Sequence, residues 1–210
     1  MKNLIIIGAR GFGREIYNLA IQTKHFNTEY IIKGFLDDNK NALDGFKNYP
    51  TIISSVEEYE VQENDVFICA LGDVKYKKKY VNLIIGKGGQ FINLIHPSVI
   101  FNQNVKMGTG NIIGAYTFVS NDVTIGNFVT IQTHVAVGHD TIIEDYCQIN
   151  AQTFFGGFSQ VKEESTINPG ACIAPKKIVN ENSIVGINSS VLKNTKPNTT
   201  VYGNPAKEIF

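Results

Sequence analysis

From Ile95 onwards the chain carries an apolar residue at every sixth position. The pattern continues without interruption to Val191, and all seventeen of these positions are apolar. Four residues after each of them stands Val, Thr, Ser, Ala or Cys in fifteen of the seventeen cases, with Asn111 and Lys177 as the exceptions. An amphipathic helix has a period of 3.6 residues and a strand alternates with a period of two, so neither alone selects a period of six. A hexapeptide β-helix, with one short strand and one corner in each hexad, has this period.

Three hexads complete one triangular coil of such a β-helix. Residues eighteen apart in the sequence are therefore expected to stack about one strand spacing, roughly 4.8 Å, from each other. The register predicts that the apolar position and the residue four places later point inward, whereas the third and fourth residues of each hexad form corners. About five to six coils fit between residues 95 and 195. Chance alternation in a β-sandwich would place turns at irregular spacing, so the sequence favours the β-helix.

The first 94 residues have a different pattern, in which short β-branched runs alternate with helical segments. Strands are predicted at 4–8, 30–36, 50–53, 65–71 and 90–94, and helices at 14–23 and 75–85. A further helix is predicted to begin with Ser54 as its N-cap. Strands that alternate with helices form parallel sheets. The predicted fold class is therefore an α/β Rossmann-like domain (1–94) followed by a parallel β-helix domain with a C-terminal tail (95–210).

Composition narrows the classes of partner. The formal net charge is zero, with 19 basic and 19 acidic residues, which argues against nucleic acid or an anionic membrane as a partner. No apolar run has the length of a signal peptide or a membrane span, so no membrane insertion is expected. The three cysteines, Cys69, Cys147 and Cys172, are odd in number and share no metal-type spacing. They fit reduced, buried thiols in a cytoplasmic protein.

The segment GARGFGR (8–14) joins a predicted strand to a predicted helix. Its three glycines would let backbone N–H groups approach a phosphate at the helix N-terminus, where the helix dipole favours anions. Arg10 and Arg14 are the only arginines in the chain, and a guanidinium group is well suited to phosphate. The structural alternatives are a turn that only closes the strand–helix junction and, for Asp37 and Asp38, a solvated turn after a strand.

His139 and Asp140 are the third and fourth residues of the hexad that begins at Val137, so they should lie on a corner and project outward. A corner histidine can simply be solvated, but a neutral imidazole can also accept a proton at cytoplasmic pH. Gly157 lies eighteen residues on, where its backbone N–H could stabilise an oxyanion beside the imidazole. The alternatives are a self-capping turn for Asp140 and a tight corner or bulge for Gly157.

A metal site is the other chemistry to weigh at this corner. His134 and His139 are five residues apart, a spacing that γ-class carbonic anhydrases also use on a hexapeptide β-helix. Catalytic zinc needs three protein ligands and an open position. Two coils before His134 stands Ser98 instead of a third histidine, and the pair is shifted by one place within the hexad. No metal is expected.

Several segments together carry a family resemblance. The hexapeptide register, the ending YGNPAKEIF, and the segments IIIGARGFGREI and GFLDDN closely resemble the family of sialic-acid O-acetyltransferases and nucleotide-amino-sugar N-acetyltransferases, whose best-known N-acetylating member acts in bacillosamine synthesis. The resemblance covers essentially the whole chain. It implies a left-handed β-helix and a cytoplasmic enzyme that uses acetyl-CoA. It also implies a homotrimer with its active sites at the subunit interfaces.

The resemblance also implies roles for particular residues. The general base of the family is a histidine followed by an acid in a VxHD/E segment, which VGHD matches, so it implies His139 as the base, Asp140 as its support and Gly157 as the oxyanion donor. The nucleotide-sugar site would be lined by Arg10, Gly11, Phe12, Asp37, Asp38, Gly72 and Lys75. Contacts to acetyl-CoA would come from Gln148, Pro169, Ile187, Gly203 and Lys207. Gln148 replaces a histidine that is common in the family, although an amide can also donate and accept hydrogen bonds.

The implied function is acetyl-CoA-dependent N-acetylation of a nucleotide-linked amino sugar, a UDP- or dTDP-linked 4-amino-4,6-dideoxyhexose, for surface glycan synthesis. One alternative is O-acetylation of a sialic acid or related hydroxyl, which would demand more from the base because a hydroxyl attacks only as it loses its proton. The other is a non-catalytic nucleotide-sugar-binding protein, which the intact VGHD segment disfavours. The sequence leaves open the nucleotide base, the stereochemistry of the sugar and the glycan pathway.

Overall fold

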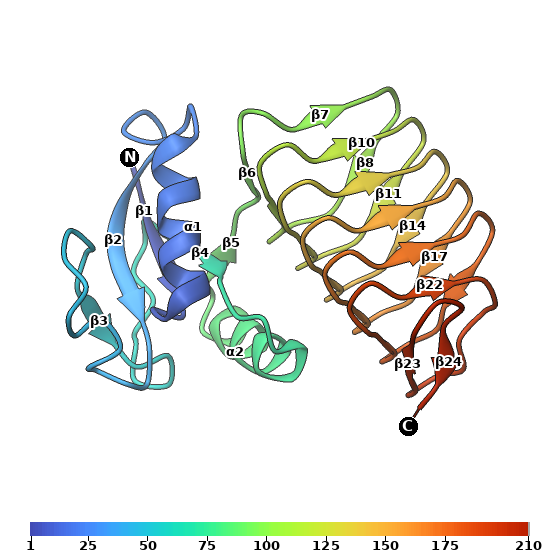
Figure 1. Ribbon diagram of the computed structural model, residues 1–210. Helices are drawn as coiled ribbons and strands as arrows, with labels where there is room; N and C mark the ends of the chain where they lie inside the picture. Colours follow the sequence, from blue (N-terminus) through green and yellow to red (C-terminus); the bar gives the residue numbers. More distant parts are fainter. Residues whose placement is uncertain (210) are drawn as a thin grey trace. The chain divides into compact units, whose positions relative to one another are not determined.

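The computed structural model describes residues 1–209, and the chain forms two compact units, Met1–Pro97 and Ser98–Phe210. Figure 1 shows an α/β unit at the N-terminal end and a stack of short strands that leads to the C-terminus. Phe210, the last residue of the predicted second domain, lies outside the described residues. The predicted fold class, an α/β region followed by a β-helix, is confirmed.

The N-terminal unit is built around a parallel sheet with the order β3-β2-β1-β4-β5. Its strands are β1 (Lys2–Ile7), β2 (Tyr30–Leu36), β3 (Ile52–Ser54), β4 (Asp65–Cys69) and β5 (Gln90–Phe91), and its helices are α1 (Gly11–Gln22) and α2 (Val74–Gly86). The central strands β1 and β4 are almost wholly buried, as expected for apolar runs covered on both faces. This arrangement brings the carboxyl ends of β1, β2 and β4 to one edge of the sheet.

The prediction of a helix that begins at Ser54 is wrong. Ser54 ends strand β3, and residues 56–58 form only a turn, in which Ser55 Oγ accepts a hydrogen bond from the Glu58 N–H at 3.2 Å. Tyr59 is then fixed by a hydrogen bond from its hydroxyl to the Asp65 carboxylate at 2.6 Å. A serine cap followed by apolar residues resembles a helix start, but tertiary contacts stop this segment after one turn.

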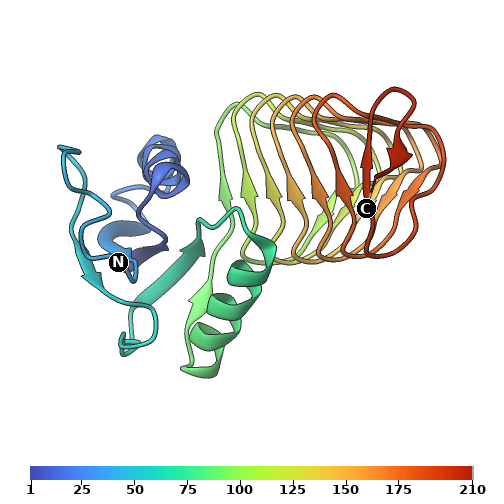
Figure 2. The ribbon, with the colours of Figure 1, turned by 60° about the horizontal axis from the view of Figure 1, so that its bottom comes forward.

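The second unit is a β-helix whose strands belong to three parallel faces, each named here after one of its strands. Figure 2 shows its successive coils stacked along the domain. The β13 face comprises β7 (Ile100–Phe101), β10 (Phe118–Val119), β13 (Ala136–Val137), β16 (Phe154–Phe155), β19 (Cys172–Ile173) and β22 (Ser190–Val191). The β14 face comprises β8 (Lys106–Met107), β11 (Thr124–Ile125), β14 (Ile142–Ile143), β17 (Gln160–Val161) and β20 (Ile178–Val179). The β15 face comprises β9 (Ile112–Ile113), β12 (Thr130–Ile131), β15 (Gln148–Ile149), β18 (Thr166–Ile167), β21 (Ile184–Val185), β23 (Thr200–Tyr202) and the antiparallel β24 (Lys207–Glu208). The short strand β6 (Leu94–Ile95), at the end of the first unit, is hydrogen-bonded to β9 and begins this face.

The predicted register is present in the strand pairing. Val137 pairs with Val119 and with Phe155, so each strand lies beside the strands eighteen residues away on either side. Every apolar position from Ile113 to Val191 is buried, with at most 2% of its surface exposed. The core is therefore a stack of these side chains, completed by small residues such as Val135 and Thr153 from four places further on.

The corners have a backbone feature that the apolar pattern does not reveal. From Asn104 to Asn188 the fourth residue of every hexad has a positive φ, for example +57° at Asp140 and +61° at Phe158. This left-handed conformation is costly for residues with a Cβ and most costly for β-branched ones. Accordingly, no Val, Ile or Thr occupies the fourth place in this range.

Two further expectations concern cysteines and membranes. Cys69 and Cys147 are buried as predicted, and burial raises the pKa of the Cys69 thiol to about 12. Cys172 is exposed, against the prediction, because it precedes the inward-pointing Ile173 and therefore faces outward from β19. Within residues 1–209 we find no helix that has both the length and the apolar character needed to cross a membrane.

Candidate active site

His139 lies on the corner between the β13 and β14 faces, with 56% of its side chain exposed. Its Nδ1 is 2.8 Å from Oδ2 of Asp140. A carboxylate only accepts hydrogen bonds, so in the neutral ring Nδ1 carries the proton and Nε2 keeps a lone pair. The left-handed conformation of Asp140 is the one that every corner adopts at this place. The repeat therefore sets the backbone on which this pair of side chains is held.

Gly157 lies directly against the imidazole. A Cβ added to Gly157 would stand 2.6 Å from both Nε2 and Cε1 of His139, so only glycine fits here without displacing the ring. Phe158 meets the same ring edge-on, with centroids 5.2 Å apart and an angle of 90°. Among the described residues, no protein group accepts a hydrogen bond from the Gly157 N–H. A proton acceptor and an unpartnered N–H donor are thus adjacent at this corner, a combination suited to acyl transfer.

The residues predicted to contact acetyl-CoA are not all brought to this corner. Pro169 and Ile187 are third-place residues eighteen apart on the corner between the β15 and β13 faces, and Ile187 is 51% exposed. The Pro169 carbonyl already accepts a hydrogen bond from the Asn188 N–H at 3.0 Å. Gln148 lies on the β15 face, is 2% exposed and donates to Asn150 Oδ1 at 3.0 Å. Within one chain, the β13 face separates the Pro169 corner from His139.

The C-terminal tail forms a small hairpin of β23 and β24. Gly203 donates its N–H to Ser189 Oγ at 3.0 Å, and its φ of +105° favours glycine. Lys207 lines a cavity of about 500 Å³ together with Lys193 and Lys196. The sequence analysis did not select the other two lysines, because they lie outside the YGNPAK segment. Glu208 also lines this cavity and pairs with Lys196 at 2.8 Å, so Lys193 and Lys207 leave it with a net positive charge, which favours an anionic ligand.

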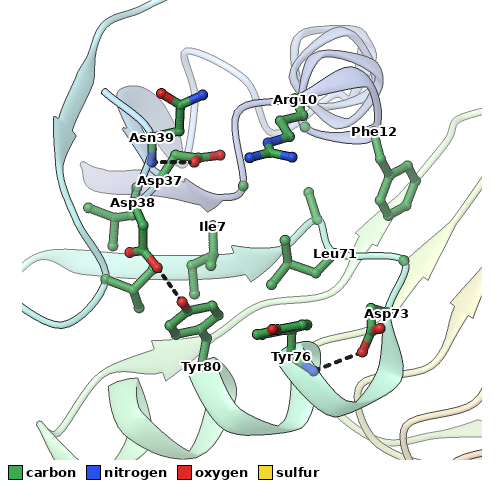
Figure 3. Close-up of a pocket in the computed structure, with 16 residues that line it drawn as sticks. Ile7, Arg10, Phe12, Asp37, Asp38, Asn39, Leu71, Asp73, Tyr76 and Tyr80 are labelled. Carbon is green, nitrogen blue, oxygen red and sulfur yellow. Dashed lines mark hydrogen bonds between the residues drawn. The ribbon is translucent and has the colours of Figure 1, made fainter. Parts of the chain in front are cut away.

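A second cavity, of about 480 Å³, lies in the N-terminal unit at the carboxyl ends of its parallel strands (Figure 3). This is the edge where ligands bind in open α/β sheets. Five of the predicted substrate residues line it: Arg10, Phe12, Asp37, Asp38 and Gly72. The other two, Gly11 and Lys75, are absent from the lining; Gly11 is the first residue of α1 and Lys75 lies on α2.

The Asp37 side chain connects the loop after β1 with the loop after β2 at this cavity. Its Oδ2 accepts a hydrogen bond from the Ala9 N–H at 2.8 Å, and its Oδ1 accepts one from the Asn39 N–H at 2.9 Å. Asp38 instead accepts a hydrogen bond from the Tyr80 hydroxyl (Figure 3). This hydrogen bond, with burial as the second cause, raises the pKa of Tyr80 well above its usual value. Both carboxylates are therefore engaged with the protein and do not form a freely solvated turn.

Tyr76 and Tyr80 are lining residues that the sequence analysis missed. They lie four residues apart on α2, and their rings stack with centroids 6.4 Å apart. Asp73 caps this helix by accepting hydrogen bonds from the N–H groups of Lys75 and Tyr76. The i, i+4 spacing of two tyrosines directly after Gly72 is the signal that could have revealed them.

Arg14 and His134 make contacts away from both candidate sites. The Arg14 guanidinium lies 3.4 Å from the centre of the Phe46 ring and does not line the cavity, unlike Arg10. The Nδ1 of His134 lies 2.8 Å from Thr133 Oγ1, and its ring packs against Tyr116. In residues 1–209 there is no group of three His, Cys, Asp or Glu residues that could hold a metal ion.

An α/β unit with a cavity at its strand ends, followed by a hexapeptide β-helix with a histidine and an unpartnered N–H at one corner, is an arrangement typical of hexapeptide acyltransferases. Comparison with known proteins is consistent with this class. Residues 3–84 match the PglD N-terminal domain family. A curated relative, the UDP-N-acetylbacillosamine N-acetyltransferase of Bacillus subtilis (strain 168), is 32% identical over 121 residues. That alignment covers 55% of this chain and 52% of the relative, so the chain spans about half the length of the relative it matches.

Solved structures agree over the full length. The acetyltransferase domain of PglB from Neisseria gonorrhoeae superposes with a TM-score of 0.87 at 24% identity and covers 100% of both chains. A histidine-to-asparagine mutant of perosamine N-acetyltransferase from Caulobacter crescentus, solved in complex with CoA and GDP-perosamine, has a TM-score of 0.88 at 20% identity, with 99% of this chain and 97% of that chain covered. At these identities the structures establish a shared fold. Together with the matching N-terminal domain, they agree with the resemblance found in the sequence: the chain is similar to acetyltransferases of nucleotide-linked amino sugars that combine an α/β unit with a β-helix.

Proposed function

We propose that this protein transfers the acetyl group of acetyl-CoA to the amine of a nucleotide-linked amino sugar, a 4-amino-4,6-dideoxyhexose. The observation that carries the proposal is that His139 lies directly against Gly157, whose backbone N–H has no hydrogen-bond partner. Acetyl-CoA, when bound, supplies an acetyl group activated as a thioester. The residues at the corner fit this group because a thioester needs one donor for its carbonyl oxygen and one base for the attacking amine.

His139 acts as the general base. Its Nε2 accepts the proton that the attacking nitrogen loses as it bonds to the thioester carbon, and it returns a proton to the sulfur when the C–S bond breaks. Asp140 holds Nδ1 and stabilises the positive charge that the ring carries in between. Gly157 donates its N–H to the carbonyl oxygen, on which negative charge develops as the nitrogen adds. One such donor typically contributes 10²–10³ in rate.

The nucleotide sugar is proposed to bind in the cavity of the N-terminal unit. Arg10 precedes α1, where the helix dipole and the first free N–H groups, including that of Gly11, favour a phosphate. Asp37, Asp38 and Gly72 also line the cavity and offer acceptors for sugar or base hydroxyl and amide groups. Phe12 adds an apolar wall, and Lys75 lies one residue before the lining residue Tyr76. The nucleotide of this activated sugar is expected to be UDP or dTDP.

We further propose a homotrimer, which the separated coenzyme residues support. Gln148 lies on the face opposite the His139 corner, so a second subunit would let Gln148, Pro169 and Ile187 line the same coenzyme. The β13 face beside the His139 corner exposes apolar side chains at Ile100, Phe118 and Phe154. A neighbouring subunit would cover them. Light scattering should then give a mass three times 23.2 kDa. The reaction would take place in the cytoplasm, the compartment that the sequence predicts.

A thiol-release assay tests the activity. Acetyl-CoA is offered with UDP-, dTDP- and GDP-linked 4-amino sugars and, in parallel, with free sialic acid. Thiol release with at least one amino sugar supports the proposal and identifies the nucleotide. Release only with sialic acid would replace it by O-acetylation, and nucleotide-sugar binding without any release would favour a binding protein.

Replacing His139 by Ala tests the mechanism. Because the variant lacks the base, kcat should fall by at least two orders of magnitude, in line with the 10²–10⁴ typical of general bases. The affinity for the nucleotide sugar, measured by calorimetry, should remain near the wild-type value since His139 does not line that cavity. Equal kcat in the variant and the wild type would rule out His139 as the base.

A further inference from the structure

The corners of the β-helix follow one hydrogen-bonding scheme. The fourth-place N–H donates to the third-place carbonyl one coil earlier, as the Phe158 N–H does to His139 O at 2.9 Å and the Lys176 N–H to Gly157 O at 3.0 Å. The third-place N–H has no part in this scheme. A corner must satisfy it by other means or leave it to solvent or a ligand.

At three corners a side chain from the next coil accepts this N–H. Asn121 Oδ1 accepts from the Gln103 N–H at 3.2 Å, and Asn127 Oδ1 accepts from the Thr109 N–H at 3.1 Å. Asp145 Oδ1 accepts from the Asn127 N–H at 2.7 Å. In each of these three cases the acceptor belongs to the third-place residue one coil, or eighteen residues, further along. An Asn or Asp at this place is therefore a cap for the corner below it.

A cap can also come from the coil before. Gln132, a second-place residue, accepts the Ala151 N–H with its Oε1 at 3.2 Å. The residue at the equivalent place for Gly157 is Gly138, which has no side chain. A Cβ on Gly138 would already stand 2.8 Å from the Gly157 nitrogen. A cap for Gly157 can therefore come only from the coil that follows.

Second-place glycines make room for two of the caps from the following coil. A Cβ on Gly108 would collide with the Asn127 amide oxygen, and one on Gly126 would collide with Asp145 Oδ1. The proposed active-site corner has the same glycine, Gly156, but the residue eighteen beyond Gly157 is Pro175. A Cβ on Gly156 would stand 2.5 Å from the Pro175 nitrogen and 2.6 Å from its Cδ. The space that holds a capping carbonyl or carboxylate elsewhere is filled here by a ring without an acceptor.

We propose that Pro175 is a positioning residue that keeps the Gly157 N–H uncapped, so that this N–H is free to donate to the substrate oxygen. The inference rests on the proposed function for its catalytic consequence, but not for its structural one. A cap would hold the N–H in an internal hydrogen bond, which the substrate oxygen would have to displace. The proline ring occupies the place of the cap and removes this competition. The availability of the Gly157 N–H is thus decided by a residue one coil further along.

Replacing Pro175 by Asn tests the inference, with Pro175→Ala as the matched control. Both variants remove the ring and restore a backbone N–H, but only Asn adds an acceptor of the kind that Asn121 provides in the same stack of corners. Pro175→Asp, which copies the cap of Asp145, is a second capping variant if the Asn variant does not fold. Two readouts are made on the full-length protein: kcat with KM for the best amino sugar, and the exchange rate and shift of the Gly157 amide in [¹⁵N]glycine-labelled protein.

The capping variants should slow exchange of the Gly157 amide at least tenfold relative to Pro175→Ala. They should also lower kcat about 10²-fold, the loss typical for one oxyanion donor, while KM for the amino sugar changes little. Equal amide exchange in the capped and control variants would overturn the inference, whatever the activity. A protected amide with unchanged kcat would overturn its catalytic part. If the wild-type protein transfers no acetyl group to any amino sugar, the proposed function fails, and the amide comparison alone then decides whether Pro175 keeps the N–H free.

Discussion

The two units of this protein place functional residues by different rules. In the β-helix, the place of a residue within its hexad decides whether it fills the core, forms a corner or faces outward. His139 and Gly157 therefore meet because they are eighteen residues apart. In the α/β unit, the position of a residue along the chain does not by itself tell which other residues it will contact. Its cavity is assembled from three strand ends and two helices, and specific contacts such as the hydrogen bond between Asp38 and Tyr80 hold it together.

The two units should also differ in how far a local change spreads. Each coil of the β-helix touches only the coils before and after it, as in other solenoids. The sheet of the α/β unit instead has one shared core, in which β1 contacts both β2 and β4. A site on the β-helix can consequently change one corner at a time, whereas the nucleotide-sugar cavity depends on its whole unit.

The largest expected effect comes from removing one buried phenylalanine side chain from the core of each unit. Phe155 in the β-helix and Phe67 in the α/β unit are both fully buried, so Phe→Ala at either position should cost about 3–5 kcal/mol of stability. Hydrogen exchange should separate the two variants. Phe155→Ala should lose protection mainly in the coils of its register partners Val137 and Ile173, and Phe67→Ala throughout residues 1–97. Equal, global loss of protection in both variants would contradict the proposed difference between the units.

A second difference concerns charge in the interior. The α/β unit buries Asp65, whose carboxylate accepts hydrogen bonds from the Tyr59 hydroxyl and from Lys33 Nζ at 2.9 Å. Burial opposes ionisation of Asp65, but these hydrogen bonds outweigh it and hold the pKa of the carboxyl below its usual value. The fully buried polar residues inside the β-helix coils, such as Thr141 and Ser159, do not titrate in this range.

Replacing Asp65 by Asn should therefore destabilise the α/β unit by about 1.5–3 kcal/mol at neutral pH, the range for hydrogen bonds to charged groups. Because the folded pKa is depressed, this contribution is present above the unfolded pKa of about 3.9 and is lost as the pH falls through the folded pKa. Denaturation curves between pH 3 and pH 7 should show the difference from wild type shrinking on the acid side. Asp145→Asn is the control in the β-helix, since an amide oxygen can still accept the Asn127 N–H. A pH-independent difference for Asp65→Asn would argue against the charged interior.

The same contrast explains what the sequence could predict. The period of six was enough for the coils, for their register and for the meeting of His139 with Gly157, because each follows from counting residues. It did not reveal the left-handed fourth place, which is a backbone property. Nor did it reveal Pro175, whose importance appears only when the caps at other corners are known. The counting also says nothing about which face of a neighbouring subunit meets Gln148.

Prediction was weaker for the α/β unit because its decisive contacts are tertiary. The turn after Ser54 was mistaken for a helix since the hydrogen bond from Tyr59 to Asp65 is invisible in a local pattern. Tyr76 and Tyr80 were missed because a tyrosine on a helix is more often part of the core than of a binding site. The glycine-rich loop could be recognised from its residues, but only the family resemblance singled out Arg10 and not Arg14 for the site.

These two arginines provide the sharpest test with the smallest expected effect. Arg10 lines the cavity of the N-terminal unit, whereas the guanidinium of Arg14, four residues on, lies over the ring of Phe46. Arg10→Ala should raise KM for the sugar nucleotide about tenfold, roughly 1.4 kcal/mol of binding, and leave kcat nearly unchanged, because it removes a phosphate contact remote from the reacting amine. Arg14→Ala should leave KM unchanged and lower stability by about 0.5–1 kcal/mol through the lost contact with the ring. Steady-state kinetics and thermal melts of the two variants, prepared side by side, separate these outcomes.

An unchanged KM in Arg10→Ala would remove Arg10 from the site. A raised KM in Arg14→Ala would mean that the whole loop, and not one guanidinium group, recognises the nucleotide.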